Sequence, residues 1–171
     1  MPVFVLVFYF PDVAWKNVML TSLFFLAGIS DWFDGYLARK LGQQSAFGAF
    51  LDPVADKLMV ATAMVLLASK HPGALMALPA IVIIGREIAI SALREWMAKV
   101  GDETKVKVSD IGKLKTASQL LAIGFLLYAE PIGRFQPMLV GYILLYIAAI
   151  LTLWSMVVYI MAAWPSLTNR E

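Results

Sequence analysis

Residues 31–56 read DWFDGYLARKLGQQSAFGAFLDPVAD, and the spacing of their four aspartates fits two helices. Asp31 and Asp34 lie three residues apart, and Asp52 and Asp56 lie four residues apart, so each pair falls on one face of its helix. We therefore expect two helices that present four carboxylates to each other at the same depth. Lys57 follows directly, and we interpret it as an interfacial or pairing charge.

Small residues accompany the aspartates on the same helix faces. Gly35 and Ala38 follow Asp34, and Gly48 precedes Asp52 by four residues. A single small residue in a membrane helix commonly serves close helix packing. Beside four carboxylates, these three positions instead favour room for a ligand backbone or a phosphate group.

The four carboxylates predict a cation site. Close together in a medium of low dielectric constant, they would repel each other unless they took up protons or bound cations. Ligation by oxygen alone suits magnesium, manganese or calcium, and a chain with no cysteine and only one histidine is poorly equipped for zinc or copper. The expected ligands are Asp31, Asp34, Asp52 and Asp56.

The composition is that of an integral membrane protein. Of the 171 residues, 61% are hydrophobic and 15% are charged, whereas soluble domains have about 45–50% and about 25%. One core of this size cannot hide so much apolar surface, so lipid must solvate much of it. The missing cysteines exclude disulfide frameworks and thiolate nucleophiles, and a net charge of +2 is too small for a nucleic-acid binder.

Uncharged runs mark the expected membrane helices. The run at 135–169 exceeds the roughly 20 residues that a span needs. Four shorter runs of 12 to 14 residues occupy 17–30, 58–69, 72–85 and 116–129. Charged residues must complete these four spans, and they fall alternately after and before the runs. Since consecutive helices alternate in direction, all of these charges lie on one side of the membrane. Turn signals at Pro11, Pro72, Gly101 and Pro131 separate the runs.

The same side holds most of the basic residues. Three lie opposite, namely Lys16, Lys70 and Arg134. Nine lie on the charged side, namely Arg39, Lys40, Arg94, Lys99, Lys105, Lys107, Lys113, Lys115 and Arg170. The positive-inside rule makes that side cytoplasmic. A purely topogenic role stays open for the loop lysines.

The N-terminal apolar segment is short. Residues 3–10 would cover only about 12 Å as a helix, against a hydrocarbon core of about 30 Å. We therefore expect one membrane domain over residues 1–171, with five spanning helices and an N-terminal stub. The chain is expected to be truncated, beginning partway into a first helix.

Carboxylate-bound cations beside Arg39 describe a site for a phosphate ester, because metal ions neutralise a transferring group and arginine anchors a second phosphate. The motif D-x2-D-G-x2-A-R-x8-G-x3-D-x3-D matches the signature of the CDP-alcohol phosphotransferase family at every fixed position. The chain resembles this family, and the resemblance implies an all-α bundle of six membrane helices. Such enzymes transfer a phosphatidyl or similar group from a CDP-linked donor to an alcohol and release CMP.

The resemblance also implies a role for each motif residue. Magnesium or manganese would be bound by Asp31, Asp34, Asp52 and Asp56, of which Asp56 would also be the general base. The CDP group would be bound by Asp31, Gly35, Ala38, Arg39, Gly48 and Asp52. The family usually begins with a longer N-terminal segment that contributes to the active site, and this chain departs from the family there.

Four further segments, FGAFLDPVADK, IGREIAISALREWMA, IGKLKTASQ and AAILTLWSMVVY, resemble the bacterial branch that uses sn-glycerol 3-phosphate as acceptor. Its dianionic phosphate requires cations near the metal site. Arg86 and Arg94 lie within about 80° on a helix, and Lys113 and Lys115 begin the next one, so these four are the candidate acceptor-phosphate ligands. The alternative is a topogenic basic rim.

In that alternative, Glu87 and Glu95 are the partners of the basic residues.

The expected enzyme converts CDP-diacylglycerol and glycerol 3-phosphate to phosphatidylglycerophosphate and CMP at the bacterial inner membrane, with its active site facing the cytoplasm. The resemblance leaves a homodimer open. Another acceptor, such as serine or inositol phosphate, also stays open. A cation or proton transporter could use intramembrane aspartates as well, although these charges gather toward one face and transport needs access from both.

Overall fold

The computed structural model describes residues 1–41, 46–100 and 110–168, and helices make up nearly all of this part. The helices are α1 (Pro2–Tyr9), α2 (Lys16–Lys40), α3 (Ala46–Lys70), α4 (Ala74–Val100), α5 (Asp110–Tyr128) and α6 (Pro137–Thr168). In the described ranges, the β structure is limited to an isolated bridge between Ile132 and Phe135. The expectation of an all-α fold is therefore confirmed for these ranges.

The helices end where the turn residues predict. Between α3 and α4, Gly73 adopts a φ of 139°, which an L side chain rarely tolerates, and its carbonyl accepts the first backbone bond of α4 from Ala77. The α5–α6 connection likewise contains Pro131, and its Gly133 has a φ of 60°. The expected breaks near Pro72 and Pro131 are thus confirmed, whereas the turn at Gly101 lies outside the described residues.

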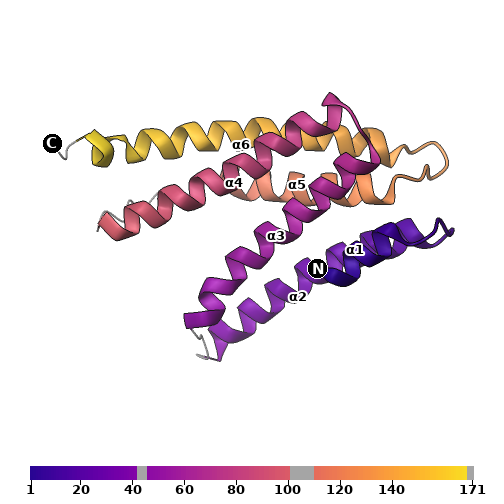
Figure 1. The fold of residues 1–171 in the computed structure, drawn as a ribbon, viewed down its shortest axis with the longest axis horizontal. Coiled ribbons are helices and arrows are strands. Elements are labelled where there is room, and N and C mark those ends of the chain that lie inside the picture. Colours follow the sequence, from indigo (N-terminus) through magenta and orange to yellow (C-terminus); the bar gives the residue numbers. More distant parts are fainter. Residues whose placement is uncertain (42–45, 101–109, 169–171) are drawn as a thin grey trace.

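The helices pack around one apolar core (Figure 1). The most extensive pair is α5 with α6, α4 packs along α6, and α2 packs against α5. From α4 and α6, helices α2 and α3 diverge toward the end where they connect to each other (Figure 1). The fully buried side chains of the core include Leu20, Phe24, Met64, Leu67, Ile83, Ile123, Leu126 and Leu145.

A glycine allows the backbones of α5 and α6 to approach closely. An added Cβ on Gly141 of α6 would lie 2.8 Å from Cγ and 3.2 Å from the backbone nitrogen of Leu126 on α5. Such approaches are typical of helix pairs whose backbones lie close together. The short apolar segment at the N-terminus forms α1, which packs on α2 with the rings of Phe4 and Phe24 6.4 Å apart.

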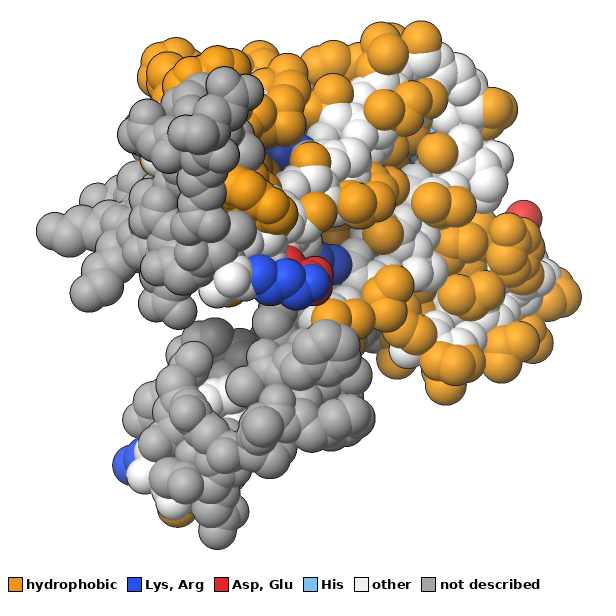
Figure 2. All heavy atoms as spheres, turned by 60° about the vertical axis from the view of Figure 1, so that its left-hand side comes forward, with side chains coloured by type: hydrophobic (Ala, Val, Ile, Leu, Met, Phe, Trp, Pro, Cys, Tyr) orange, Lys and Arg blue, Asp and Glu red, His pale blue; other side chains and the backbone are white. Residues whose placement is uncertain are grey.

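Length and composition single out two helical segments in the described ranges that could cross a membrane, Ala74–Lys99 and Pro137–Trp164. A shorter apolar helix covers Leu114–Tyr128. Large apolar side chains on these helices point outward, among them Ile81 and Ile88 of α4 and Ile150 of α6. In Figure 2, hydrophobic side chains cover much of the coloured surface, a group of basic and acidic side chains lies near the middle of this face, and a few other charged atoms lie at its edges.

Candidate active site

The acidic motif lies on two helices, as its spacing predicts. Asp31 and Asp34 fall within the bounds of α2, and Asp52 and Asp56 fall within those of α3. Both Asp34 and Asp56 have exposed side chains. Gly35 is partly buried next to Asp34. The prediction of two helices carrying the four carboxylates is therefore confirmed.

Whether the four carboxylates share one site is not decided by the described side chains. The side chains of five predicted site residues lie outside them, namely Asp31, Ala38, Arg39, Asp52 and Lys113. Among the side chains that the structure does describe, no three His, Asp or Glu residues are placed to hold a metal ion. The shared metal site and the CDP site stay predictions.

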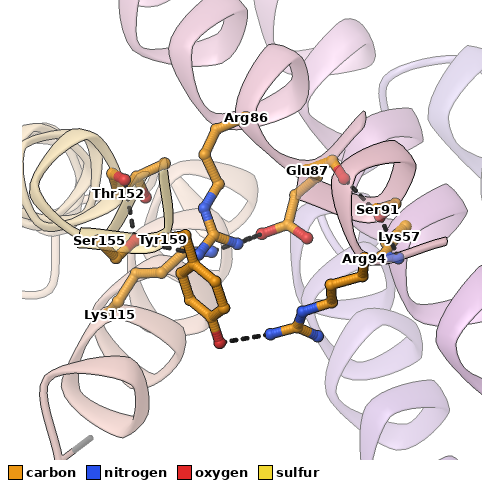
Figure 3. A network of polar contacts seen from close by, with 9 residues as sticks. All are labelled: Lys57, Arg86, Glu87, Ser91, Arg94, Lys115, Thr152, Ser155 and Tyr159. Atoms are coloured by element: carbon orange, nitrogen blue, oxygen red, sulfur yellow. Dashed lines mark hydrogen bonds and ion pairs between the residues drawn. The ribbon is translucent and has the colours of Figure 1, made fainter. Parts of the chain in front are cut away.

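The predicted basic residues are brought together with partners from four helices (Figure 3). Arg86 and Arg94 project from α4, Lys115 comes from α5, and Lys57 comes from α3. Of the nine side chains drawn in Figure 3, four are cationic and Glu87 is the one carboxylate. We call these nine residues the basic cluster; its positive excess makes it a suitable place for an anionic group.

Glu87 connects two of the cations. Its Oε1 accepts hydrogen bonds from Lys115 Nζ of α5 and, at 3.3 Å, from Arg86 Nη1 on its own helix. The Lys115 side chain is 8% exposed and that of Glu87 is 22% exposed, so this ion pair is largely shielded from solvent. Since an unpaired charge in such surroundings costs several kcal/mol, each partner requires the other.

Of the two glutamates named in the alternative of a basic rim, Glu87 pairs with residues of the basic cluster and Glu95 does not. Glu87 does pair with Arg86 and Lys115, whereas Glu95 pairs at 2.8 Å with Lys99, and both members of that second pair are exposed. Two buried polar atoms of the basic cluster, Arg86 Nε and Thr152 Oγ1, have no hydrogen-bond partner among the described residues. An unmet guanidinium donor such as Arg86 Nε favours an anionic ligand.

Lys57 joins the helix of the acidic motif to the basic cluster. Its Nζ donates to Ser91 Oγ on α4 at 2.5 Å, and Ser91 Oγ donates to the backbone carbonyl of Glu87 at 2.6 Å. This contact joins Lys57 to a neutral hydroxyl, so its interpretation as an interfacial or pairing charge stays a prediction. Because Lys57 follows Asp56 directly, this contact brings one end of the acidic motif next to the α4 segment that carries Arg86 and Glu87.

Three residues of the basic cluster come from α6, namely Thr152, Ser155 and Tyr159, and the sequence reasoning missed all of them, including the two that bind arginines. Ser155 Oγ accepts a hydrogen bond from Arg86 Nη2 at 3.0 Å, and the Tyr159 hydroxyl accepts one from Arg94 Nη2 at 2.5 Å. Both lie in the long apolar run of 135–169, which we interpreted only as a span. Their separation of four residues, which places two hydroxyls on one helix face, is the signal that could have identified them.

The chain is similar to known proteins over nearly its full length. Residues 1–154 match the family model described as CDP-alcohol phosphatidyltransferase. A protein of Pseudomonas fluorescens named CDP-diacylglycerol--glycerol-3-phosphate 3-phosphatidyltransferase is 52% identical over 167 residues, which cover 97% of this chain and 85% of that protein.

Two further relatives carry the same name. The protein of Haemophilus influenzae is 50% identical over 169 residues, covering 99% of this chain and 89% of the relative. The protein of Escherichia coli (strain K12) is 48% identical over 169 residues, covering 99% of this chain and 91% of the relative. The similarity therefore extends over the acidic motif and the basic cluster alike.

The Glu87–Lys115 pair yields a prediction about stability. Replacing Glu87 with Gln removes the charge that compensates Lys115 and Arg86, so we expect the free energy of unfolding to fall by about 1 to 3 kcal/mol. The matched control is Glu95→Gln, which breaks an exposed pair on the same helix and should leave the stability nearly unchanged. Thermal unfolding of both purified variants measures the difference; equal losses would contradict a special role for Glu87.

Proposed function

The chain belongs to the CDP-alcohol phosphatidyltransferase family, and we propose that it is the enzyme that transfers a phosphatidyl group from CDP-diacylglycerol to sn-glycerol 3-phosphate. The products are phosphatidylglycerophosphate and CMP. The observation that carries this function is about 50% identity, over nearly the full length, to curated relatives named for this reaction. Because those relatives are transferases, the transporter alternative is set aside.

The donor set fits the divalent metal ion that the family uses. Asp34 and Asp56 offer exposed carboxylate oxygens, and the single histidine, His71, lies in the turn that follows α3, at the opposite end of that helix from Asp56. All-oxygen ligation suits magnesium or manganese. We propose that the ion is held by Asp31, Asp34, Asp52 and Asp56. When bound, it supplies neutralisation of the negative charge on the donor diphosphate.

The reaction assigned to Asp56 is a proton transfer. Its carboxylate accepts the proton of the acceptor's primary hydroxyl, and the hydroxyl oxygen forms a new bond to the phosphorus of the phosphatidyl group. The bond between that phosphorus and the oxygen of CMP breaks, and CMP leaves with the electron pair. Asp56 is exposed in the N-terminal half of α3, so its carboxylate is accessible to an acceptor.

The CDP group is assigned to the small and charged residues of the motif. Gly35 and Gly48 are partly buried glycines, and the absence of a side chain leaves space for the donor beside the carboxylates. The complete proposed set is Asp31, Gly35, Ala38, Arg39, Gly48 and Asp52. Arg39 is suited to a second phosphate of the donor because its guanidinium can bind phosphate oxygens in pairs.

The acceptor phosphate is assigned to the basic cluster. Arg86, Arg94 and Lys115 gather there, and the open Arg86 Nε is a donor that a phosphate oxygen can satisfy. The Lys57–Ser91 contact supports the position of this cluster next to the segment that carries Asp56. Lys113, two residues before Lys115, is proposed as a fourth ligand. A phosphorylated acceptor is therefore favoured over serine.

The proposed setting is the bacterial inner membrane. We propose that α2 to α6 cross it and that the ends carrying the acidic motif and the basic cluster face the cytoplasm. The apolar lengths of α4 and α6 and the outward hydrophobic side chains in Figure 2 support this arrangement. In this arrangement the lipid donor would enter the active site from the bilayer, and the soluble acceptor would enter it from the cytoplasm.

The function is tested by measuring CMP release from the purified chain with CDP-diacylglycerol and one acceptor at a time. We expect release with sn-glycerol 3-phosphate, much less with serine or inositol phosphate, and none after chelation until magnesium or manganese is restored. Turnover that was faster with another acceptor would overturn the assignment of glycerol 3-phosphate. Turnover that survived chelation would contradict the metal site.

The four aspartates predict a common loss of activity. Changing any one of them to Asn removes a metal ligand and, at Asp56, the base, so CMP release should fall by at least about 100-fold. The four positions are Asp31, Asp34, Asp52 and Asp56. Asp12→Asn is the control, because exposed Asp12 precedes α2 at its other end and pairs with Lys16. Near-normal turnover in two of the four variants would contradict a shared site.

The basic cluster predicts a selective effect on the acceptor. Changing Arg86, Arg94 or Lys115 to Ala should raise the KM for glycerol 3-phosphate by about tenfold or more, since a hydrogen bond to a charged group is worth about 1.5 to 3 kcal/mol. The KM for CDP-diacylglycerol should change much less. Lys99→Ala, at an exposed pair on the same helix, is the control. Equal changes in both KM values would assign these residues a structural role.

A further inference from the structure

One side of α6 faces the two arginines of the basic cluster with hydroxyl groups. Ser155 and Tyr159 are four residues apart, which places them one above the other on this side. Each accepts a hydrogen bond from one arginine of α4, Ser155 from Arg86 and Tyr159 from Arg94. The two guanidinium groups are therefore both held from the same neighbouring helix.

The hydroxyl of Ser155 is oriented by its own helix. Its Oγ donates to the backbone carbonyl of Thr152 at 2.9 Å, so its proton is already used within α6. The remaining lone pairs accept the Nη2 hydrogen of Arg86 at 3.0 Å. This bond fixes one edge of the Arg86 guanidinium, while its buried Nε makes no hydrogen bond to the described residues.

Tyr159 contacts both arginines. Its hydroxyl accepts from Arg94 Nη2 at 2.5 Å, and its ring centroid lies 5.0 Å from Arg94 Cζ and 5.6 Å from Arg86 Cζ. Both distances fall within the range of about 6 Å for an attraction between a cation and an aromatic ring. Figure 3 shows the ring beside both guanidinium groups.

Two neighbouring guanidinium groups repel each other, and a long arginine side chain loses conformational entropy when a ligand fixes it. The electron-rich ring of Tyr159 offsets part of the repulsion, and its hydroxyl restrains exposed Arg94 before any ligand binds. A site that is ordered in advance binds more tightly, because less entropy is lost on binding.

We propose that Tyr159 is a positioning residue that holds Arg86 and Arg94 together as a pair of ligands for the acceptor phosphate. The proposal rests on the proposed function, since it assumes that this phosphate binds in the basic cluster. Tyr159 acts through the arginines and does not itself take part in the chemical step. Its loss should therefore weaken binding of the acceptor and leave the donor lipid and the turnover number nearly unchanged.

The first test compares Tyr159→Phe with Tyr159→Leu. Phe keeps the ring and loses the hydroxyl that holds Arg94, so the KM for glycerol 3-phosphate should rise roughly fivefold. Leu also loses the ring, so the rise should reach roughly 30-fold. In Tyr159→Phe, kcat and the KM for CDP-diacylglycerol should stay within about twofold. Tyr146→Phe, about 20 Å earlier on α6, is the matched control and should change neither KM.

The second test is a double-mutant cycle that a merely structural role would not reproduce. In an Arg94→Gln background, the hydroxyl that Tyr159→Phe removes no longer has its arginine partner, so this substitution should raise the acceptor KM by less than about twofold further. The same fivefold rise in both backgrounds would overturn the proposal, as would a parallel rise in the KM for CDP-diacylglycerol. The Phe variant keeps these tests valid if the Leu variant fails to fold.

The outcomes separate this proposal from the function on which it rests. If the unchanged chain releases no CMP with glycerol 3-phosphate, the proposed function fails, and the positioning role fails with it. If Arg86→Ala and Arg94→Ala raise the acceptor KM but the Tyr159 variants do not, the function stands and only the positioning role is wrong.

Discussion

Charged side chains on apolar helices need partners, and the Glu87–Lys115 ion pair meets this need by linking α4 to α5, both of which pack on α6. A charge without a partner in such surroundings would cost several kcal/mol, so the pair restrains where these two helices lie on α6. Arg86 shares the same carboxylate and reaches α6 through Ser155. The rest of the basic cluster is arranged around this one carboxylate (Figure 3).

The proposed function follows from how α3 is tied to this arrangement. Lys57 bonds to Ser91 of α4, and its chain neighbour Asp56 is thereby placed close to the cluster that we assign to the acceptor phosphate. A phosphoryl transfer between a nucleotide-linked lipid and a phosphorylated alcohol needs both kinds of site side by side, because positioning of the reactants supplies much of the rate. Lys57 thus connects α3, which carries Asp52 and Asp56, to α4, which carries Arg86 and Arg94.

Spacing along the chain predicted what depends on a single helix. The two aspartate pairs fall on helices, the five uncharged runs fall mainly within α2 to α6, and Gly73 lies in a break because its positive φ suits glycine. Partners between helices could not be predicted in this way, since spacing gives the face of a helix and not the neighbour that it meets. Thus Glu87 and Glu95 were equal candidates, and Tyr159 was hidden in an apolar run. The acceptor was suggested only by family resemblance.

The central claim is that a metal site and a phosphate site lie next to each other, on either side of the Lys57–Ser91 contact. The most direct measurement is a crystal structure of the chain with manganese and glycerol 3-phosphate, in which anomalous scattering locates the metal. We predict manganese bound by Asp34, Asp56 and the other two motif aspartates, with the acceptor phosphate on Arg86 and Arg94. Manganese bound elsewhere, or a phosphate bound away from these arginines, would contradict the account.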